Sequence, residues 1–190
     1  MNKIISIVAF LLILILIACC PGKRKIVYNN FSQEDLKWAI YNIGDSITFS
    51  NNKNEIRHFI VRKIYKDTLP EMDKFSFSCT SNYFMRWTYK IYPDTAKDIN
   101  RYDSPINFHI ENLHKAIYIS ANWYDTYGYN INNEANKSIT IRGKVFDDVY
   151  VAYSDTLGFK PNVLKFFYSR KYGFIRFDEY NGDVWELIFN

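Results

Sequence analysis

The stretch VLKFFYSRKYGFIRFDEYNGDVWELIF, residues 163–189, decides the fold of this chain. It contains three segments rich in apolar and aromatic residues, separated by two short polar breaks. The segments are 163–168, 174–178 and 184–189, and the breaks fall at 169–173 and at Asn181-Gly182. Asn-Gly is a strong hairpin signal, because both central residues of the tight turn must take positive φ. The stretch therefore predicts three antiparallel strands in sequence.

The same alternation of apolar and polar residues runs through most of the chain from Asp45 onward. The further expected strands are 46–49, 56–66, 75–79, 83–92, 106–110, 116–124, 138–142 and 144–153. Polar turn formers fill 93–105, and an Asn-rich loop fills 130–136. The pattern predicts an all-β fold: a single antiparallel β meander that forms a half-open barrel or sandwich.

One short N-terminal helix is compatible with this fold. Ser32 is a good N-cap, acidic residues follow it in the first turn, and Gly44 would end the helix. An α+β fold, with this helix against the sheet, is the near alternative.

Length and composition restrict the class of protein. The chain has 190 residues, 48% of them hydrophobic and 23% charged, which fits one globular domain and excludes a disordered protein. The formal net charge of +4 is too small and too scattered for a nucleic-acid binder.

The N-terminus has the features of a bacterial lipoprotein signal. Lys3 precedes an uncharged apolar run over residues 4–18, which is shorter than a membrane-spanning helix. The run ends in Leu16-Ile17-Ala18-Cys19, which resembles a lipobox, so cleavage before Cys19 and acylation of its thiol are expected. The expected division is a signal peptide over 1–18, a lipidated tether over 19–30 and a single β-rich domain over 31–190.

The other two cysteines and the basic cluster after the anchor have simpler interpretations. Cys20 lies on the tether, and Cys79 shares the parity of neighbouring phenylalanines and is expected in the core. Lys23-Arg24-Lys25 could contact anionic headgroups or act only as a solubilising linker.

The sequence shows no catalytic or metal-binding motif, and we expect neither an enzyme nor a cofactor. His109 and Glu111 share one side of a strand, but nothing nearby supplies a third metal ligand. The carboxylate pairs Asp147-Asp148, Asp178-Glu179 and Asp183 with Glu186 mostly sit at strand ends or turns, where acidic residues are common for solubility.

Aromatic residues, 18% of the chain, are the main feature that suggests ligand binding. Most suit a β-sheet core. Trp123, Tyr127 and Tyr129 are the candidates for a ligand surface, because two of the three lie in a polar loop that core packing does not explain.

A second pattern occurs more often than composition predicts: Asp, then Ser or Thr, then an apolar residue. It resembles the O-glycosylation signal of Bacteroidota. The candidate acceptors in polar connections are Thr68, Thr95 and Thr156, and a fourth match is Asp45-Ser46-Ile47. Turn chemistry offers the alternative explanation, since Asp-Ser and Asp-Thr cap strand ends.

The lipobox, these sites and two sequence blocks resemble small lipoproteins of Bacteroidota. The blocks are residues 36–49, with Trp38, Tyr41 and Gly44, and residues 167–187, with Gly173 and Asn181-Gly182. The resemblance implies a lipid anchor in the cell outer membrane but no particular activity. Surface-exported relatives often carry acidic residues after the lipidated cysteine, so the basic cluster here implies a periplasmic face.

The expected function is that of a membrane-anchored envelope lipoprotein without catalysis, with a scaffold or protein-interaction role. The expected partners are the membrane, through the N-terminal lipid, and a protein of the envelope, but no nucleic acid. The alternative is a protein that binds an apolar or glycan ligand in the concavity of a half-open β-sheet.

Overall fold

The computed structural model describes residues 25–71, 80–96, 106–113, 116–123, 129–131, 137–154 and 163–189. These ranges contain twelve strands and one short 3₁₀ helix. The elements are β1 (Lys25–Asn29), η1 (Asp35–Trp38), β2 (Ser46–Asn51), β3 (Ile56–Pro70), β4 (Thr80–Pro93), β5 (Ile106–Leu113), β6 (Ala116–Trp123), β7 (Tyr129–Ile131), β8 (Lys137–Ile141), β9 (Lys144–Tyr153), β10 (Val163–Ser169), β11 (Gly173–Glu179) and β12 (Val184–Leu187).

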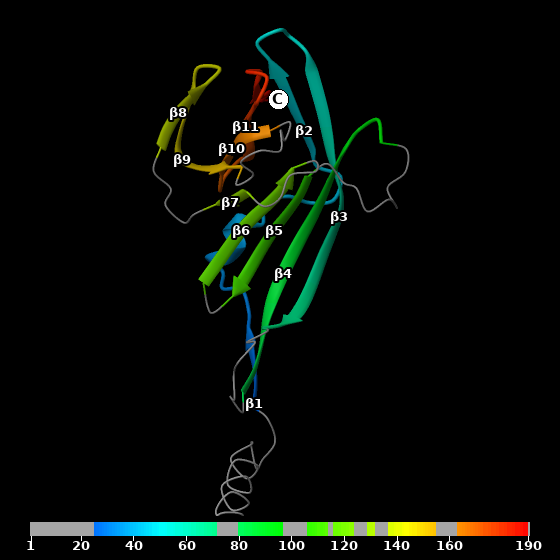
Figure 1. The fold of residues 1–190 in the computed structure, drawn as a ribbon, viewed down its shortest axis with the longest axis vertical. Helices are drawn as coiled ribbons and strands as arrows, with labels where there is room; N and C mark the ends of the chain where they lie inside the picture. The colour runs from blue at the N-terminus through cyan, green and yellow to red at the C-terminus, as the bar shows by residue number, and fades with distance from the viewer. Residues whose placement is uncertain are drawn as a thin grey trace, which may run out of the picture.

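The strands form one curved sheet that is not closed into a barrel (Figure 1). Its order is β7-β6-β5-β4-β3-β2-β12-β11-β10-β9-β8, so two antiparallel meanders are joined where β2 pairs with β12. The far ends of the sheet approach each other, because β7 contacts β9. The prediction of an all-β, antiparallel, half-open sheet is confirmed.

The C-terminal strands follow their sequence signals closely. β10, β11 and β12 pair antiparallel in chain order, and Gly182 in the Asn-Gly turn has a φ of 90°. β3 and β4 extend further than their alternation suggests, to Pro70 and from Thr80. The expected strand over 75–79, including Cys79, lies outside the described residues.

β1 is the element that the sequence prediction missed. The sequence places residues 19–30 in a tether, but Lys25–Asn29 is a strand that pairs parallel with β4. The register runs from Lys25 opposite Thr80 to Asn29 opposite Phe84. Its Ile-Val-Tyr centre has high β propensity. The residues were predicted as a linker because a basic cluster comes directly before them.

The expected helix is reduced to the single turn η1. The N-cap is Glu34 and not Ser32. Ser32 and Asp35 bond to each other just before the turn: the Ser32 hydroxyl accepts the N–H of Asp35 at 3.2 Å, and the Asp35 carboxylate accepts the N–H of Ser32 at 2.7 Å. The turn stops early because Trp38 is buried and its carbonyl accepts the Tyr168 hydroxyl at 2.8 Å. No α-helix forms within the described ranges, so the α+β alternative is not observed there.

The concave face of the sheet is filled by aromatic rings from both meanders. The Phe108 ring lies 5.0 Å from Tyr168 and 5.3 Å from Phe174, measured between ring centroids. These contacts cross the interior from β5 to β10 and β11. Within the described residues, the core therefore occupies the space between the two meanders. A second cluster, on the opposite face of β10 and β11, is covered by the β8–β9 hairpin and consists of Ile141, Phe146, Val149, Phe167 and Ile175.

Candidate functional site

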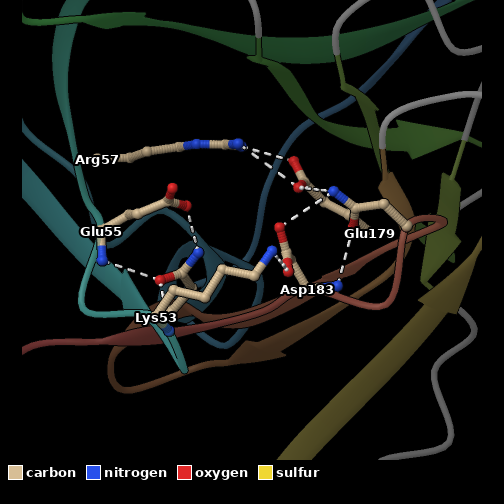
Figure 2. A network of polar contacts seen from close by, with 7 residues as sticks. Lys53, Glu55, Arg57, Glu179 and Asp183 are labelled. Atoms are coloured by element: carbon tan, nitrogen blue, oxygen red, sulfur yellow. Dashed lines mark hydrogen bonds and ion pairs between the residues drawn. The ribbon is translucent and has the colours of Figure 1, made fainter.

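Two tight turns meet at the end of the sheet opposite β1, and they organise the main polar cluster of the described chain (Figures 1 and 2). One turn spans 51–55 between β2 and β3, and the other spans 179–183 between β11 and β12. They lie together because β12 pairs with β2, which places Trp185 opposite Asn51. We call the two turns together the paired turns.

An asparagine fixes each of the paired turns. The Asn51 side-chain oxygen accepts the N–H groups of Lys53, at 3.0 Å, and of Glu55, at 2.9 Å. The Asn181 side-chain oxygen accepts the N–H of Asp183 at 2.9 Å. Such side-chain bonds mimic backbone turns, so they set the direction in which the charged neighbours project.

Two ion pairs connect the first turn, and the strand that follows it, to the second turn. Arg57, just after the first turn, lies 2.6 Å from a carboxylate oxygen of Glu179, and the Lys53 ammonium lies 2.6 Å from Asp183. The Arg57 guanidinium also stacks on the Trp185 ring, 3.9 Å from its centroid. The hydrogen bond to Asp183 raises the pKa of Lys53, so that side chain stays protonated.

Three of the carboxylates that the sequence offered as catalytic candidates, Asp178, Glu179 and Asp183, are paired with cations. Glu179 and Asp183 are buried, and each meets a basic side chain. Asp178 lies 2.7 Å from Arg176 and 3.1 Å from Lys165. These carboxylate oxygens are therefore in contact with basic side chains of the protein itself.

An open cavity of about 310 Å³ adjoins the paired turns. It is lined by Ile56, Arg57, His58, Phe59, Pro93, Asp94 and Thr95. The β3–β4 register shapes it by placing Phe59 opposite Pro93, and the N–H of Asp94 donates to the His58 carbonyl at 3.1 Å. The Ile56 side chain is 57% exposed at the rim. The cavity thus combines exposed apolar surface with a guanidinium, an imidazole and a carboxylate.

The aromatic candidates from the sequence are not brought together in the described structure. Trp123 is 0% exposed, and its ring lies 4.8 Å from Phe177 and 5.2 Å from Phe174. The expectation that Trp123 belongs to a ligand surface is therefore wrong, because the ring lies in the core. Tyr129 belongs to β7, opposite Ala121, and Tyr127 lies outside the described residues.

The modification candidates have different surroundings. Thr95 is exposed in the turn after β4, as expected, and lines the open cavity. Thr68 is exposed too, but it lies within β3, opposite Met85, rather than in a connection. Thr156 and Cys19 lie outside the described residues.

His109 and Glu111, weighed as metal ligands, have other roles. The His109 Nδ1 lies 3.0 Å from the Thr88 hydroxyl, and Glu111 pairs with Arg86 at 2.6 Å. Burial, together with the charges of Arg86 and Lys90, lowers the pKa of His109 to about 4, so this imidazole is neutral at pH 7. Across the described ranges, no three His, Cys, Asp or Glu side chains are placed to hold a metal ion.

Sequence reasoning did not find the paired turns as a cluster. Arg57 and Glu179 are 122 positions apart and meet only through the β2–β12 pairing. The sequence does predict the Asn-Gly turn, but no sequence pattern indicates that the turn over 51–55 lies beside it.

Comparisons with known proteins give the chain no relative. No family model, curated protein or solved structure matches it. Among the described residues, no helix has the length and apolar character needed to cross a membrane.

Proposed function

We propose that this protein is a lipoprotein of the cell envelope, anchored through acylated Cys19, that binds a protein partner and catalyses no reaction. The observation that carries the proposal is the lipobox, Leu16-Ile17-Ala18-Cys19, in a chain whose first strand begins at Lys25. The proposed location is the outer membrane, facing the periplasm, in keeping with the basic residues after Cys19.

Two features of the described domain support a role in binding rather than catalysis. Asp183 and Glu179 contact Lys53 and Arg57, and aromatic rings pack on the concave face in the part of the chain that the structure describes. A general acid or base needs a side chain that can reach a substrate. Two carboxylates of the paired turns contact basic side chains of the protein instead.

The paired turns and the adjoining cavity are the proposed partner-binding surface. They lie at the end of the sheet opposite β1, so an anchor near β1 would hold them away from the membrane (Figure 1). Exposed Ile56 lines the cavity together with the polar residues Arg57, His58 and Asp94. An apolar centre within a polar rim is the usual composition of a protein interface.

The anchor is tested by metabolic labelling with palmitate in a Bacteroidota host. We expect label on the wild-type chain and on Cys20→Ser, and none on Cys19→Ala. The wild type should fractionate with outer membranes and resist protease added to intact cells. Equal labelling of Cys19→Ala and wild type would refute the anchor, and digestion in intact cells would refute the periplasmic orientation.

The partner surface is tested by photo-crosslinking in the same cells. A benzophenone amino acid at position 56 should give a discrete adduct with one protein. The matched control is position 145, since the Val145 and Ile56 side chains are both 57% exposed but lie on different strands. The absence of an adduct from position 56, or the same adducts from both positions, would contradict the proposed surface.

A further inference from the structure

β1 limits how far the domain can lie from a lipid anchor. Lys25 is the first residue of the strand, and six Cα-to-Cα steps separate it from Cys19. A fully extended chain covers about 3.3–3.6 Å per residue, so the start of β1 lies within roughly 20 Å of the anchored residue. A tether that ran to residue 30 would have allowed nearly twice that reach.

The parallel pairing of β1 with β4 extends this constraint to other parts of the sheet. Lys25 lies opposite Thr80, and the same end of β4 pairs with the end of β3, where Tyr83 lies opposite Pro70. Figure 1 shows β1 and these strand ends together, at the opposite extreme of the molecule from the paired turns. We call Lys25–Asn29 with the adjoining part of β4, residues 80–84, the β1 end.

The β1 end exposes apolar and aromatic side chains. Ile26 is 53% exposed and Tyr28 is 57% exposed, and both lie on one side of β1. The Tyr28 ring pairs with that of Tyr83, with 5.5 Å between centroids, so the two tyrosines form a continuous surface across both strands. Tyrosine suits the membrane interface, because its ring is apolar while its hydroxyl can remain hydrated.

The charges around this surface are mixed, with a basic group at its start. Lys25 is exposed, and it continues the cluster that begins with Lys23 and Arg24. Among the described residues, the charged side chains next to the β1 end include Lys66, which lies 4.0 Å above the Trp87 ring, Asp67, opposite Arg86 on β4, and Glu71. The basic residues closest to the anchor favour an anionic surface such as lipid headgroups.

We propose that the β1 end, through Ile26, Tyr28 and Tyr83, lies against the headgroup layer of the bilayer that holds the acyl anchor. The proposal rests on the proposed acylation of Cys19. The domain then stands on the membrane in one orientation, with the paired turns pointing away from it. The bilayer is favoured as occupant because the short reach from Cys19 keeps this surface beside it.

The test uses the full acylated chain in vesicles made of three parts phosphatidylethanolamine to one part phosphatidylglycerol. Cys20 and Cys79 are replaced by serine, and a nitrobenzoxadiazole label is attached at Ile26→Cys or Tyr28→Cys. The control label is at Tyr180→Cys, since Tyr180 is 43% exposed and lies in the second of the paired turns. Far-ultraviolet circular dichroism checks that each variant retains its strands.

Doxyl-labelled lipids report on contact with the bilayer. We expect labels at 26 and 28 to lose roughly half of their fluorescence, and the label at 180 to lose almost none, because the doxyl group quenches only at short range. Vesicle flotation of the same samples tests the anchor separately. A chain that fails to float refutes the anchor.

A chain that floats with unquenched labels at 26 and 28 overturns the membrane contact and leaves the anchor intact. Quenching of the label at 180 as strongly as those at 26 and 28 also overturns the proposed orientation. If labels at 26 and 28 are shielded only after envelope proteins are added, the surface binds a protein and the proposal fails.

Discussion

The hydroxyl group of Tyr41 occupies the space that a β-carbon at Gly173 would need. This hydroxyl also accepts the N–H of Phe174 at 2.7 Å, and the Tyr41 ring stacks on that of Phe174. Burial raises the pKa of Tyr41, so the hydroxyl keeps its proton. One tyrosine thus joins the segment after η1 to the start of β11.

Gly173→Ala should destabilise the fold strongly. Its φ of 75° is strained for alanine, and the new methyl group would collide with the Tyr41 ring. We expect a loss of about 3 kcal/mol or more in the free energy of unfolding, measured by urea denaturation. Gly182→Ala is the matched control: its φ is 90°, but no atom lies near the added carbon, so a loss of about 1 kcal/mol is expected.

Equal losses for the two alanine variants would show that backbone strain alone acts at position 173. Tyr41→Phe in the Gly173→Ala background should recover only part of the loss. The substitution removes the hydroxyl oxygen, but a ring carbon of residue 41 would still be in the way.

Arg57→Ala should destabilise the domain by about 2–4 kcal/mol, because it leaves the Glu179 carboxylate buried without its cation and uncovers Trp185. Lys37→Ala is the control, since Lys37 and its partner Glu34 are both exposed and such an ion pair contributes little. Urea midpoints at pH 7 measure both. If both variants have the wild-type midpoint, the ion pair of Arg57 makes no net contribution.

The strands could be predicted from the sequence because alternation and turn chemistry are local signals. The Asn181-Gly182 turn and the three strands around it are confirmed. The β2–β12 pairing could not be predicted, since it joins residues more than 130 positions apart and no local pattern encodes it. β1 was missed for a similar reason: its partner, residues 80–84, is distant in sequence.

The candidate site is less predictable from the sequence than the strands are. Aromatic residues stack on ligands, which makes Trp123 a candidate, but the same property makes an indole a good core residue, and only the fold distinguishes the two. The pairing of Arg57 with Glu179 had no counterpart in the sequence analysis, because it depends on the order of the strands.

Trp123→Ala should test the core position of that ring. Removing a buried indole leaves a cavity, and a loss of about 3–5 kcal/mol in the free energy of unfolding is expected. Trp123→Phe should cost less, because it keeps an aromatic ring against Phe174. Thermal or urea denaturation measures both variants, and a wild-type midpoint for Trp123→Ala would place the ring outside the core.

Thr95 is the stronger of the two described candidates for O-glycosylation. It is exposed in a turn, whereas Thr68 is held in the β3–β4 ladder, where an enzyme would have less access to the backbone. In a Bacteroidota host, we expect a carbohydrate increment in the intact mass that decreases in Thr95→Val. Thr68→Val should keep that part of the increment. A wild-type mass without a carbohydrate increment would refute O-glycosylation of this protein.

Lowering the pH should reduce the free energy of unfolding of the domain, because His109 is buried as a neutral side chain. At pH values above about 6.5, the side chain is neutral in both the folded and the unfolded chain. Its pKa falls from 6.5 to about 4 on folding, so between these values the unfolded chain binds a proton that the folded chain does not. The free energy of unfolding therefore decreases as the pH falls through this window, by a contribution on the order of 2 kcal/mol, and His109 adds no further loss below about pH 4.

His109→Gln should remove this contribution while keeping a polar partner for the Thr88 hydroxyl. The measurement is the difference between urea midpoints at pH 7 and pH 4.5, compared among wild type, His109→Gln and His58→Gln. His58 is exposed and bonds to a threonine hydroxyl in the same way, at 2.9 Å from Thr48. The glutamine at 109 should reduce the pH effect, because burial of His109 is the main cause of its lowered pKa. The variant at 58 shows what the same substitution does at an exposed histidine. If His109→Gln keeps the full wild-type effect, the acid sensitivity does not arise from His109.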